Sequence, residues 1–188
     1  MGFDIFSLMY KLFLLLLVSL SSLTKSQPGE VIDSYQNVPI FFNGKIGDVH
    51  GRHKTPDGYN LGLKWQCVEY VKRFYYVKYK HKMPDAYGHA KDLFDESLAD
   101  VAYNEKRGLL QFRNVRYSWP QQGDLLVLRG NRDNPYGHCG IISRVDDDEL
   151  ELMQQNYGNT TRVNYKIVVY NNIVTIAEHD VLGWLRMP

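Results

Sequence analysis

Residues 61–76 read LGLKWQCVEYVKRFYY, and the whole chain can be interpreted outward from this stretch. A glycine-containing, aromatic approach leads into a cysteine, Cys67. The apolar residues after it recur at a spacing of three to four, which predicts a helix with one buried face. We expect this helix to begin near Cys67 and to end near residues 80–82, before Met83-Pro84. The residues on its buried face are Val68, Val71, Phe74, Tyr75 and Val77.

The predicted position of Cys67, in the first turn of a helix, suits a nucleophile. Unpaired N–H groups and the positive end of the helix dipole stabilise a negative charge there. The thiolate is the reactive form of cysteine, so this environment activates the side chain. Cysteine is also among the most often buried residues. A catalytic interpretation therefore needs a base elsewhere in the chain.

Composition describes an ordinary globular protein without a bias toward a charged partner. The chain has 188 residues, of which 44% are hydrophobic and 23% are charged, and its formal net charge is +1. Without residues 1–26, the basic and acidic residues are equal in number. We therefore expect one compact domain and no nucleic-acid partner.

The first 26 residues have the pattern of a secretory signal peptide. Residues 12–20 read LFLLLLVSL, an apolar core that follows a lysine and is too short to span a bilayer comfortably. Thr24 and Ser26 are small residues at the −3 and −1 positions of a cleavage site after Ser26. We predict a secreted or periplasmic protein, with no stable membrane anchor after signal removal and with residues 27–188 as the folded domain.

The remaining chain predicts helices first and strands afterwards. Residues 27–60 are rich in turn residues, with a short strand at 38–42. A second helix is predicted at 88–99, and residues 100–120 are predicted to be irregular. This order predicts an α+β fold with N-terminal helices packed on an antiparallel β-sheet. The strands are expected at 124–129, 140–145, 149–153, 162–170 and 181–186.

Two histidines, His50 and His53, have a spacing that can ligate a metal on a helix. Their segment is interrupted by glycines and offers no cysteine or clear third ligand. We therefore interpret them as loop histidines and expect neither a metal nor a cofactor.

A second cysteine lies beside a histidine in residues 136–142, which read YGHCGII. His138 is expected at the start of a strand, where the flanking glycines allow close approach of a substrate or another backbone. Cys139 should point to the opposite face of that strand, as a buried neighbour of Ile141. This alternation argues against a Cys67–Cys139 disulfide. A disulfide-stapled secreted domain nevertheless remains an alternative.

The strand after the acidic run 146–148 ends in three side-chain amides, at 154–156. If the strands on either side of the acidic run pair as a hairpin, Gln154 returns to the neighbourhood of His138. Cysteine hydrolases need a thiolate, an imidazole and a polar group that orients the imidazole. That third group can be an amide. The pattern therefore nominates Cys67 with these two residues.

These motifs resemble the CHAP domain, a papain-like, NlpC/P60-like family of cysteine, histidine-dependent amidohydrolases and peptidases. The resemblance is carried in order by GLKWQCVEY, GHCGII, QQN and LGW, and it covers nearly all of residues 35–188. Within the family, the motifs are most similar to the amidase domain of glutathionylspermidine synthetase/amidase. The resemblance implies a papain-like α+β fold, with Cys67 as nucleophile and His138 as general base and acid.

One position departs from the family pattern. The family commonly has Glu, Asp or Asn as its third residue, and Gln154 stands where the similar amidases have a carboxylate. A neutral amide can orient the imidazole of His138, but it supplies no full charge. We therefore expect a less stabilised thiolate–imidazolium pair and a lower activity.

Further site residues can be assigned around Cys67. The backbone N–H of Cys67 and the side chain of Gln66 are candidate oxyanion donors. Lys72 stands where the similar amidases carry an arginine that meets the substrate, and a lysine cannot reproduce a bidentate clamp. Asn156 is assigned to the same substrate and oxyanion group.

The expected function is that of an exported cysteine amidohydrolase or peptidase. Export favours a peptidoglycan peptide as substrate, whereas the motifs favour a glutathionylspermidine-like peptide–amine conjugate. The alternative from another class is a binding module that keeps the fold and has lost activity, which the glutamine at position 154 supports.

Overall fold

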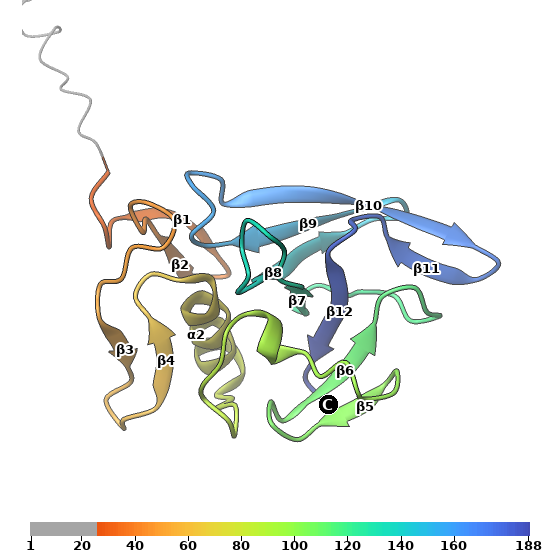
Figure 1. Ribbon diagram of the computed structural model, residues 1–188, viewed down its shortest axis with the longest axis horizontal. Coiled ribbons are helices and arrows are strands. Elements are labelled where there is room, and N and C mark those ends of the chain that lie inside the picture. Colours follow the sequence, from red (N-terminus) through yellow and green to blue (C-terminus); the bar gives the residue numbers. More distant parts are fainter. Residues whose placement is uncertain (1–25) are drawn as a thin grey trace, which may run out of the picture.

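The computed structural model describes residues 26–188, so the predicted signal peptide lies outside the described residues apart from Ser26. Within this range the chain forms one α-helix, α2 (Cys67–Tyr79), one 3-10 turn, η1 (Lys91–Leu93), and twelve β-strands (Figure 1). None of the helices in this range is long and apolar enough to cross a membrane. The strands are β1 (Val31–Tyr35), β2 (Val38–Phe41), β3 (Arg52–Lys54), β4 (Asn60–Leu63), β5 (Ala102–Asn104), β6 (Leu109–Arg113), β7 (Leu125–Leu128), β8 (His138–Val145), β9 (Glu149–Gln154), β10 (Arg162–Tyr170), β11 (Ile173–Ile176) and β12 (Val181–Arg186).

An eight-stranded antiparallel sheet forms the centre of the fold, in the order β11-β10-β9-β8-β7-β12-β6-β5. The helix α2 packs against β8 on one side and against β4 on the other (Figure 1). The strands β3 and β4 form a small separate sheet, as do β1 and β2. The helix is therefore enclosed between the large sheet and the N-terminal hairpins.

The helix around which the sequence was interpreted is present with the predicted start. It begins at Cys67, after Gln66 in an extended conformation, and ends before Lys80, whose φ of 55° breaks the helical geometry. Val71, Phe74 and Tyr75 of the apolar stripe are buried as expected, whereas Val68 is partly buried and Val77 is 42% exposed. Tyr70 and its stripe neighbours anchor α2 to the sheet, so the position of Cys67 is set by burial of the helix face.

Two apolar cores cover the two faces of the large sheet. The first lies between α2 and the sheet and includes Tyr70 from the helix and Ile141 from β8. The second surrounds Trp184, which is fully buried, on the opposite face of the sheet. The sheet curls so far that β11 meets the chain beyond β6, where Val174 and Arg116 exchange backbone hydrogen bonds.

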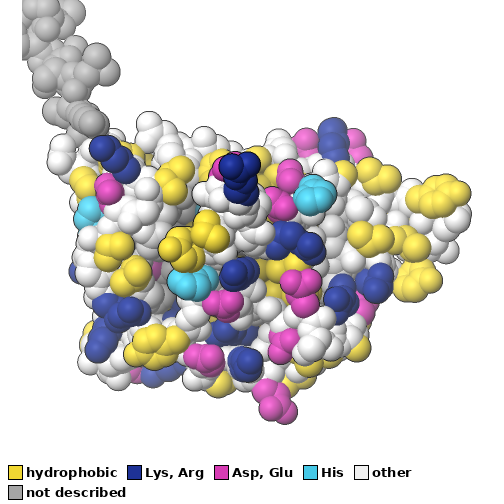
Figure 2. All heavy atoms as spheres, viewed as in Figure 1, with side chains coloured by type: hydrophobic (Ala, Val, Ile, Leu, Met, Phe, Trp, Pro, Cys, Tyr) yellow, Lys and Arg dark blue, Asp and Glu magenta, His cyan; other side chains and the backbone are white. Residues whose placement is uncertain are grey.

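The β10–β11 hairpin projects from the body, and apolar side chains are exposed at its tip (Figure 2). Val168 and Tyr170 are 51% and 73% exposed. The turn consists of Asn171 and Asn172, both with positive φ, as the common two-residue hairpin turn requires. The tip therefore lies outside both cores.

The strands predicted after residue 123 are all present, as β7, β8, β9, β10 and β12, with end points that differ by a few residues. The acidic run 146–148 connects β8 to β9 as predicted. The predicted strand at 38–42 is β2. Alternation of apolar residues therefore located the central strands correctly.

The prediction of several N-terminal helices is wrong, because residues 88–99 contain only the short turn η1. Contacts from β6 and its preceding turn replace the helical hydrogen bonds. Arg107 donates to the backbone oxygen of Asp92 at 2.6 Å. The side chain of Gln111 bonds to both the N–H and the C=O of Asp95, at 2.9 and 2.8 Å. The α+β class thus holds in a coarser form, as one helix on an extensive antiparallel sheet.

Residues 100–120, predicted to be irregular, contain β5 and β6, and β6 pairs with β12 inside the large sheet. The sequence interpretation also missed β1, β3, β4 and β11. These strands are three to five residues long, and β3 and β5 are partly polar. Short segments of this kind give little periodicity to detect.

Gly137 sets the start of β8. Its φ is +75°, and a Cβ added there would lie 2.5 Å from the backbone oxygen of Leu128, in the neighbouring strand. His138 pairs with Leu128 in the sheet. Only glycine allows both the positive φ and the close approach to Leu128. Gly137 therefore sets the position at which His138 enters the sheet.

We expect Gly137→Ala to destabilise the protein by about 2–5 kcal/mol, because a left-handed conformation and a clash add together. The matched control is Gly58→Ala, where φ is +85° and an added Cβ meets nothing within 4 Å. That variant should lose only about 1–2 kcal/mol. Urea denaturation measures both, and equal losses would contradict the close approach to Leu128.

Candidate active site

Three predicted site residues meet where α2 begins and where β8 and β9 pair. The sulfur of Cys67 is hydrogen-bonded to the ring of His138. The Nε2 atom of His138 lies 2.9 Å from Oε1 of Gln154, so the ring N–H donates to the amide oxygen. Gln154 is held opposite Gly140 by the β8–β9 register. The nucleophile, imidazole and orienting-group candidates therefore form one continuous line of contacts.

The surroundings favour a thiolate on Cys67. A hydrogen bond from Cys139 contributes most to lowering the pKa of Cys67 well below its ordinary value, and the charge and hydrogen bond of His138 add to it. Burial acts in the opposite direction but does not prevail. Burial alone would lower the pKa of His138, yet the negative charge of Cys67 and bonds to Cys67 and Gln154 raise it. Together these shifts favour a thiolate–imidazolium pair.

The expectation that Cys139 stays away from the site is wrong. Cys139 does share a buried cluster with Ile141, as strand alternation predicted. The same face of β8, however, receives the first turn of α2, so the thiol and the backbone N–H of Cys139 both hydrogen-bond to Cys67. Both cysteines are free thiols. The geometry thus brings a second thiol to the predicted nucleophile without a disulfide.

Gln66 and Asn156 are brought together beside the nucleophile. The amide oxygen of Gln66 accepts a hydrogen bond from Nδ2 of Asn156 at 2.5 Å, and its Nε2 donates to the backbone oxygen of Asp48 at 2.7 Å. Asn43 holds the other end of this chain, since its Nδ2 donates to Oδ1 of Asn156 and its Oδ1 accepts from the N–H of Trp65. The side chain next to Cys67 is therefore fixed by a network of amides.

A buried carboxylate anchors the first turn of α2, and the sequence interpretation missed it. Glu69 is fully buried and accepts hydrogen bonds from Arg73 at 2.6 Å, His53 at 2.7 Å and Gln155 at 2.9 Å. Burial raises its pKa, but these partners outweigh burial and lower it. Gln155 also donates to the backbone oxygen of Gln66. The i,i+4 pairing of Glu69 with Arg73 was the available sequence signal.

Lys72 does not line the site, which corrects its assignment as a substrate contact. Its side chain is 1% exposed, and Nζ donates to the backbone oxygens of Asn60 and Ala86. The ammonium also lies 4.9 Å from the ring centre of Tyr59. Burial lowers the pKa of Lys72 to about 8. Its donors are directed at the main chain, so the residue stabilises the fold around α2.

An exposed aromatic residue covers the imidazole. The ring of Tyr157 is centred 5.2 Å from the ring of His138, at an angle of 48°, and Tyr157 is 55% exposed. It follows the amide run at the end of β9, where Asn156 has a φ of +63°. Tyr157 therefore separates part of the His138 ring from solvent.

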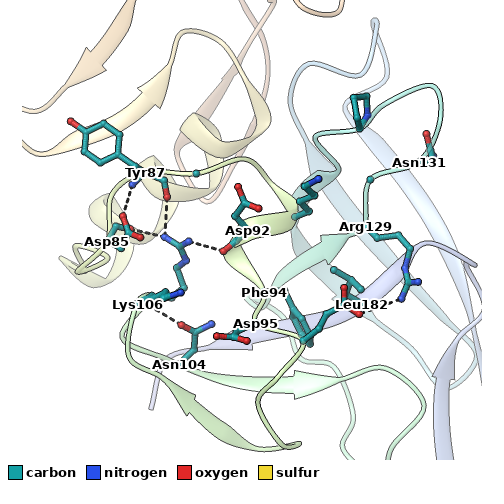
Figure 3. A pocket seen from close by; sticks show the side chains of 16 residues that line it. Asp85, Tyr87, Asp92, Phe94, Asp95, Asn104, Lys106, Arg129, Asn131 and Leu182 are labelled. Atoms are coloured by element: carbon teal, nitrogen blue, oxygen red, sulfur yellow. Dashed lines mark hydrogen bonds and ion pairs between the residues drawn. The ribbon is translucent and has the colours of Figure 1, made fainter.

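A pocket of about 960 Å³ is lined by residues from η1, the segments that flank it and the β7–β8 loop (Figure 3). Neither Cys67 nor His138 lines it, but it adjoins the segment before His138, since the N–H of Lys91 donates to the backbone oxygen of Tyr136. Its charged lining combines both signs: Asp85, Lys91, Asp92, Asp95, Glu96, Lys106, Arg107 and Arg129. In residues 26–188, no group of three or more His, Cys, Asp or Glu side chains is arranged to hold a metal ion.

The profile of the CHAP domain matches residues 57–156, a span that contains Cys67, His138 and Gln154. The chain therefore belongs to the CHAP domain family, and the resemblance found in the sequence motifs is confirmed.

Two larger proteins are similar to this chain over part of their length. The chain is 25% identical over 164 residues to trypanothione synthetase of Crithidia fasciculata, covering 81% of this chain and 25% of that protein. It is 28% identical over 138 residues to bifunctional glutathionylspermidine synthetase/amidase of Escherichia coli, covering 66% and 22%. The chain thus spans about a quarter of the length of these relatives.

A solved structure of a wild-type endolysin, LysIME-EF1, is also similar. The match has 21% sequence identity and a TM-score of 0.41, and it covers 74% of this chain and 59% of that chain.

The charge coupling between Cys67 and His138 predicts an unusual pH profile of alkylation. Because the lowered pKa keeps Cys67 ionised as the pH falls, iodoacetamide should label it well below the ordinary thiol pKa of about 8.5. Cys139, which is fully buried and has a raised pKa, should stay unlabelled in the folded chain.

The control is His138→Ala, which removes the positive charge. At pH 6 its labelling rate should fall about tenfold relative to the unmodified chain, while at pH 9 the two rates should converge. Superimposable pH profiles for the two chains would contradict the ion pair. Peptide mapping by mass spectrometry identifies the labelled cysteine.

Proposed function

We propose that the chain is a cysteine amidohydrolase or peptidase that cleaves an amide bond through the Cys67 thiolate. The observation that carries the proposal is the contact of the Cys67 sulfur with the ring of His138, whose Nε2 lies 2.9 Å from Gln154. Family membership, and the amidase named among the relatives, support a hydrolase acting on amide bonds.

In the proposed reaction the thiolate attacks the amide carbonyl carbon and forms a tetrahedral intermediate. The backbone N–H of Cys67, at a helix start where such groups lack intrahelical acceptors, stabilises the oxyanion together with Gln66. One N–H of the Gln66 amide is donated to Asp48, which leaves the second for the substrate. The His138 imidazolium then protonates the leaving amine. Water, deprotonated by His138, hydrolyses the thioester and regenerates the thiolate.

Asn156 holds the Gln66 side chain in the orientation that this role requires. Its Nδ2 holds the Gln66 amide oxygen, which directs the Gln66 Nε2 group away from Asn156. We therefore assign Asn156 as a positioning residue rather than as an oxyanion donor. Asn43, outside the residues matched by the family profile, completes this support through its bond to Asn156.

Two substrate classes are compatible with the proposed chemistry. One is a peptidoglycan peptide, and the other is a peptide–amine conjugate similar to glutathionylspermidine. The relatives named for glutathionylspermidine support the second class. The two classes are distinguished by experiment below.

We also propose that the protein is exported, with cleavage after Ser26 and with residues 27–188 as the catalytic domain. The apolar run at 12–20 supports this proposal. Intact mass of the protein recovered outside the producing cells should correspond to a chain that begins at Gln27. Recovery of the uncut chain in the cytoplasm would overturn the proposal.

The hydrolase proposal is tested with the full chain and with Cys67→Ala. Each is incubated with purified peptidoglycan and, separately, with glutathionylspermidine, and released amines are followed by mass spectrometry. We expect the full chain to cleave one of the two substrates. The rate of that cleavage should be lower by at least about 10³-fold in Cys67→Ala, because the nucleophile is missing. The substrate that is cleaved identifies the class.

Failure of the full chain to cleave either substrate, together with slow alkylation of Cys67, would favour the non-catalytic binding module. A folding control is needed only for Cys67→Ala, since the full chain is tested directly. Its circular dichroism spectrum should match that of the unmodified chain.

Gln154→Glu tests the effect of the missing carboxylate. A carboxylate 2.9 Å from the imidazole would stabilise its protonated form. The alkaline limb of the pH–rate profile should therefore move up by about one unit or more, and the rate at neutral pH should rise. The control, Gln154→Ala, removes the orienting group and should lower the rate. An unchanged or lower rate in Gln154→Glu would refute this account.

A further inference from the structure

The side-chain amide of Gln66 belongs to a closed ring of hydrogen bonds. Its Nε2 donates to the backbone oxygen of Asp48 at 2.7 Å, and its Oε1 accepts from Nδ2 of Asn156 at 2.5 Å. Nδ2 of Asn43 donates to the same Asp48 oxygen at 3.2 Å and to Oδ1 of Asn156 at 3.0 Å. Asn43 therefore contacts both of the groups that hold Gln66, and it closes the ring.

Asn43 is buried and fully paired. Its side chain is 2% exposed, and its Oδ1 accepts the backbone N–H of Trp65, the residue before Gln66, at 2.9 Å. A buried amide is stable only when its donors and its acceptor have partners, and here all of them do. These partners lie on both sides of the Gln66 side chain and on the backbone that leads into it. Asn43 is therefore joined to Gln66 by three separate routes.

A tight turn directs the Asp48 carbonyl into the ring. The N–H of Asp48 donates to the backbone oxygen of Lys45 at 3.1 Å, and the N–H of Lys45 donates to the Asp48 carboxylate at 2.8 Å. Nδ2 of Asn43 also donates to the Lys45 oxygen, at 3.1 Å. The turn is thus closed by its own bonds, and Asn43 ties it to the rest of the ring.

The ring sets the orientation of the Gln66 amide. A backbone oxygen can only accept a hydrogen bond, so Nε2 of Gln66 must face Asp48 and Oε1 must face Asn156. An oxyanion donor is effective when it is aimed before the negative charge develops. Without Asn43, the Asp48 turn and the Asn156 side chain would each lose a tether, and the Gln66 amide could rotate with them.

We propose that Asn43 is a positioning residue of the oxyanion hole, which aims Gln66 at the negative charge that develops during acyl transfer. This role rests on the proposed function, since it requires Cys67 to attack a carbonyl group. Asn43 takes no part in forming the thiolate, because the imidazole of His138 is held by Gln154, outside the ring.

The proposal separates two reactions of Cys67. In acyl transfer from p-nitrophenyl acetate, the thiolate adds to the carbonyl carbon and the carbonyl oxygen becomes an oxyanion. The C–O bond to p-nitrophenolate then breaks, and an acetyl thioester remains that water later hydrolyses to acetate. In alkylation, the thiolate attacks the methylene carbon of iodoacetamide and expels iodide, so no oxyanion forms. Loss of Asn43 should therefore slow the first reaction and spare the second.

The test compares the full chain with Asn43→Ala. Release of p-nitrophenolate is followed by absorbance, and the rate in Cys67→Ala is subtracted. Acylation should slow by about tenfold or more in Asn43→Ala, because a misplaced donor stabilises the oxyanion poorly. Alkylation of Cys67 by iodoacetamide should keep its rate. Cys139, which is fully buried, should stay unlabelled and so reports an intact fold.

The matched control is Asn104→Ala. Asn104 is 3% exposed, and its Nδ2 donates to Oε1 of Gln111 at 2.9 Å. It lies in β5, which three strands separate from β8 in the order of the large sheet. The same chemical change in a similarly buried amide should leave both rates unchanged.

Two further variants test the route through Gln66. Asn43→Asp keeps the acceptor for the Trp65 N–H but loses the donors to Asp48 and Asn156, so it should slow acylation as much as Asn43→Ala. In a Gln66→Ala chain, Asn43→Ala should slow acylation no further, because the residue through which it acts is absent.

Three outcomes would overturn the proposal: unchanged acylation in Asn43→Ala, an equal loss of acylation and alkylation, or losses that multiply in the double variant. The proposed hydrolase function fails by a different result, in which the unmodified chain is acylated but cleaves neither peptidoglycan nor glutathionylspermidine. A lower ratio of acylation to alkylation in Asn43→Ala would still support the role of Asn43 in that case.

Discussion

The structure depends on the pairing of one buried carboxylate, Glu69, in the first turn of α2. A charge without exposure to water is costly unless its partners are complete. Here the partners come from three places: His53 from β3, Arg73 from the next turn of α2, and Gln155 from the residue directly after β9. The network can form only when the β3–β4 sheet, α2 and the large sheet are packed against one another. It thereby ties the start of α2, and with it Cys67, to the end of β9.

The site is a consequence of that docking. Once α2 begins over the paired ends of β8 and β9, the Cys67 sulfur contacts the His138 ring from one side and the Cys139 thiol from another. The His138 ring in turn donates a hydrogen bond to the side-chain oxygen of Gln154, a neutral group that adds no charge. Stabilisation of the thiolate is correspondingly shared between an imidazole and a neighbouring thiol. A glutamine in the third position is consistent with this division, because part of the stabilisation acts on the sulfur directly.

Two buried cations, Lys72 and Arg107, also join separate parts of the chain by bonding to backbone oxygens. Lys72 donates to backbone oxygens of Asn60 and Ala86, and Arg107 donates to those of Asp85, Tyr87 and Asp92. Three of these carbonyls come directly before the segment 88–99, where a second helix was predicted, and that of Asp92 lies within it. Residues from both stretches line the pocket (Figure 3).

Residue patterns were enough to predict the α2 helix, the central strands and the β8–β9 hairpin, because periodicity and chain order specify which faces are apolar and which strands are neighbours. That Cys67 joins His138 and Gln154 was expected from the resemblance to the CHAP domain. The place of Cys139 beside the nucleophile and the absence of a helix at 88–99 became visible only in the folded chain. Each of these depends on hydrogen bonds between side chains and backbone groups that are distant in the chain. Such contacts leave no periodic trace in the sequence, since they exist only after the elements have docked.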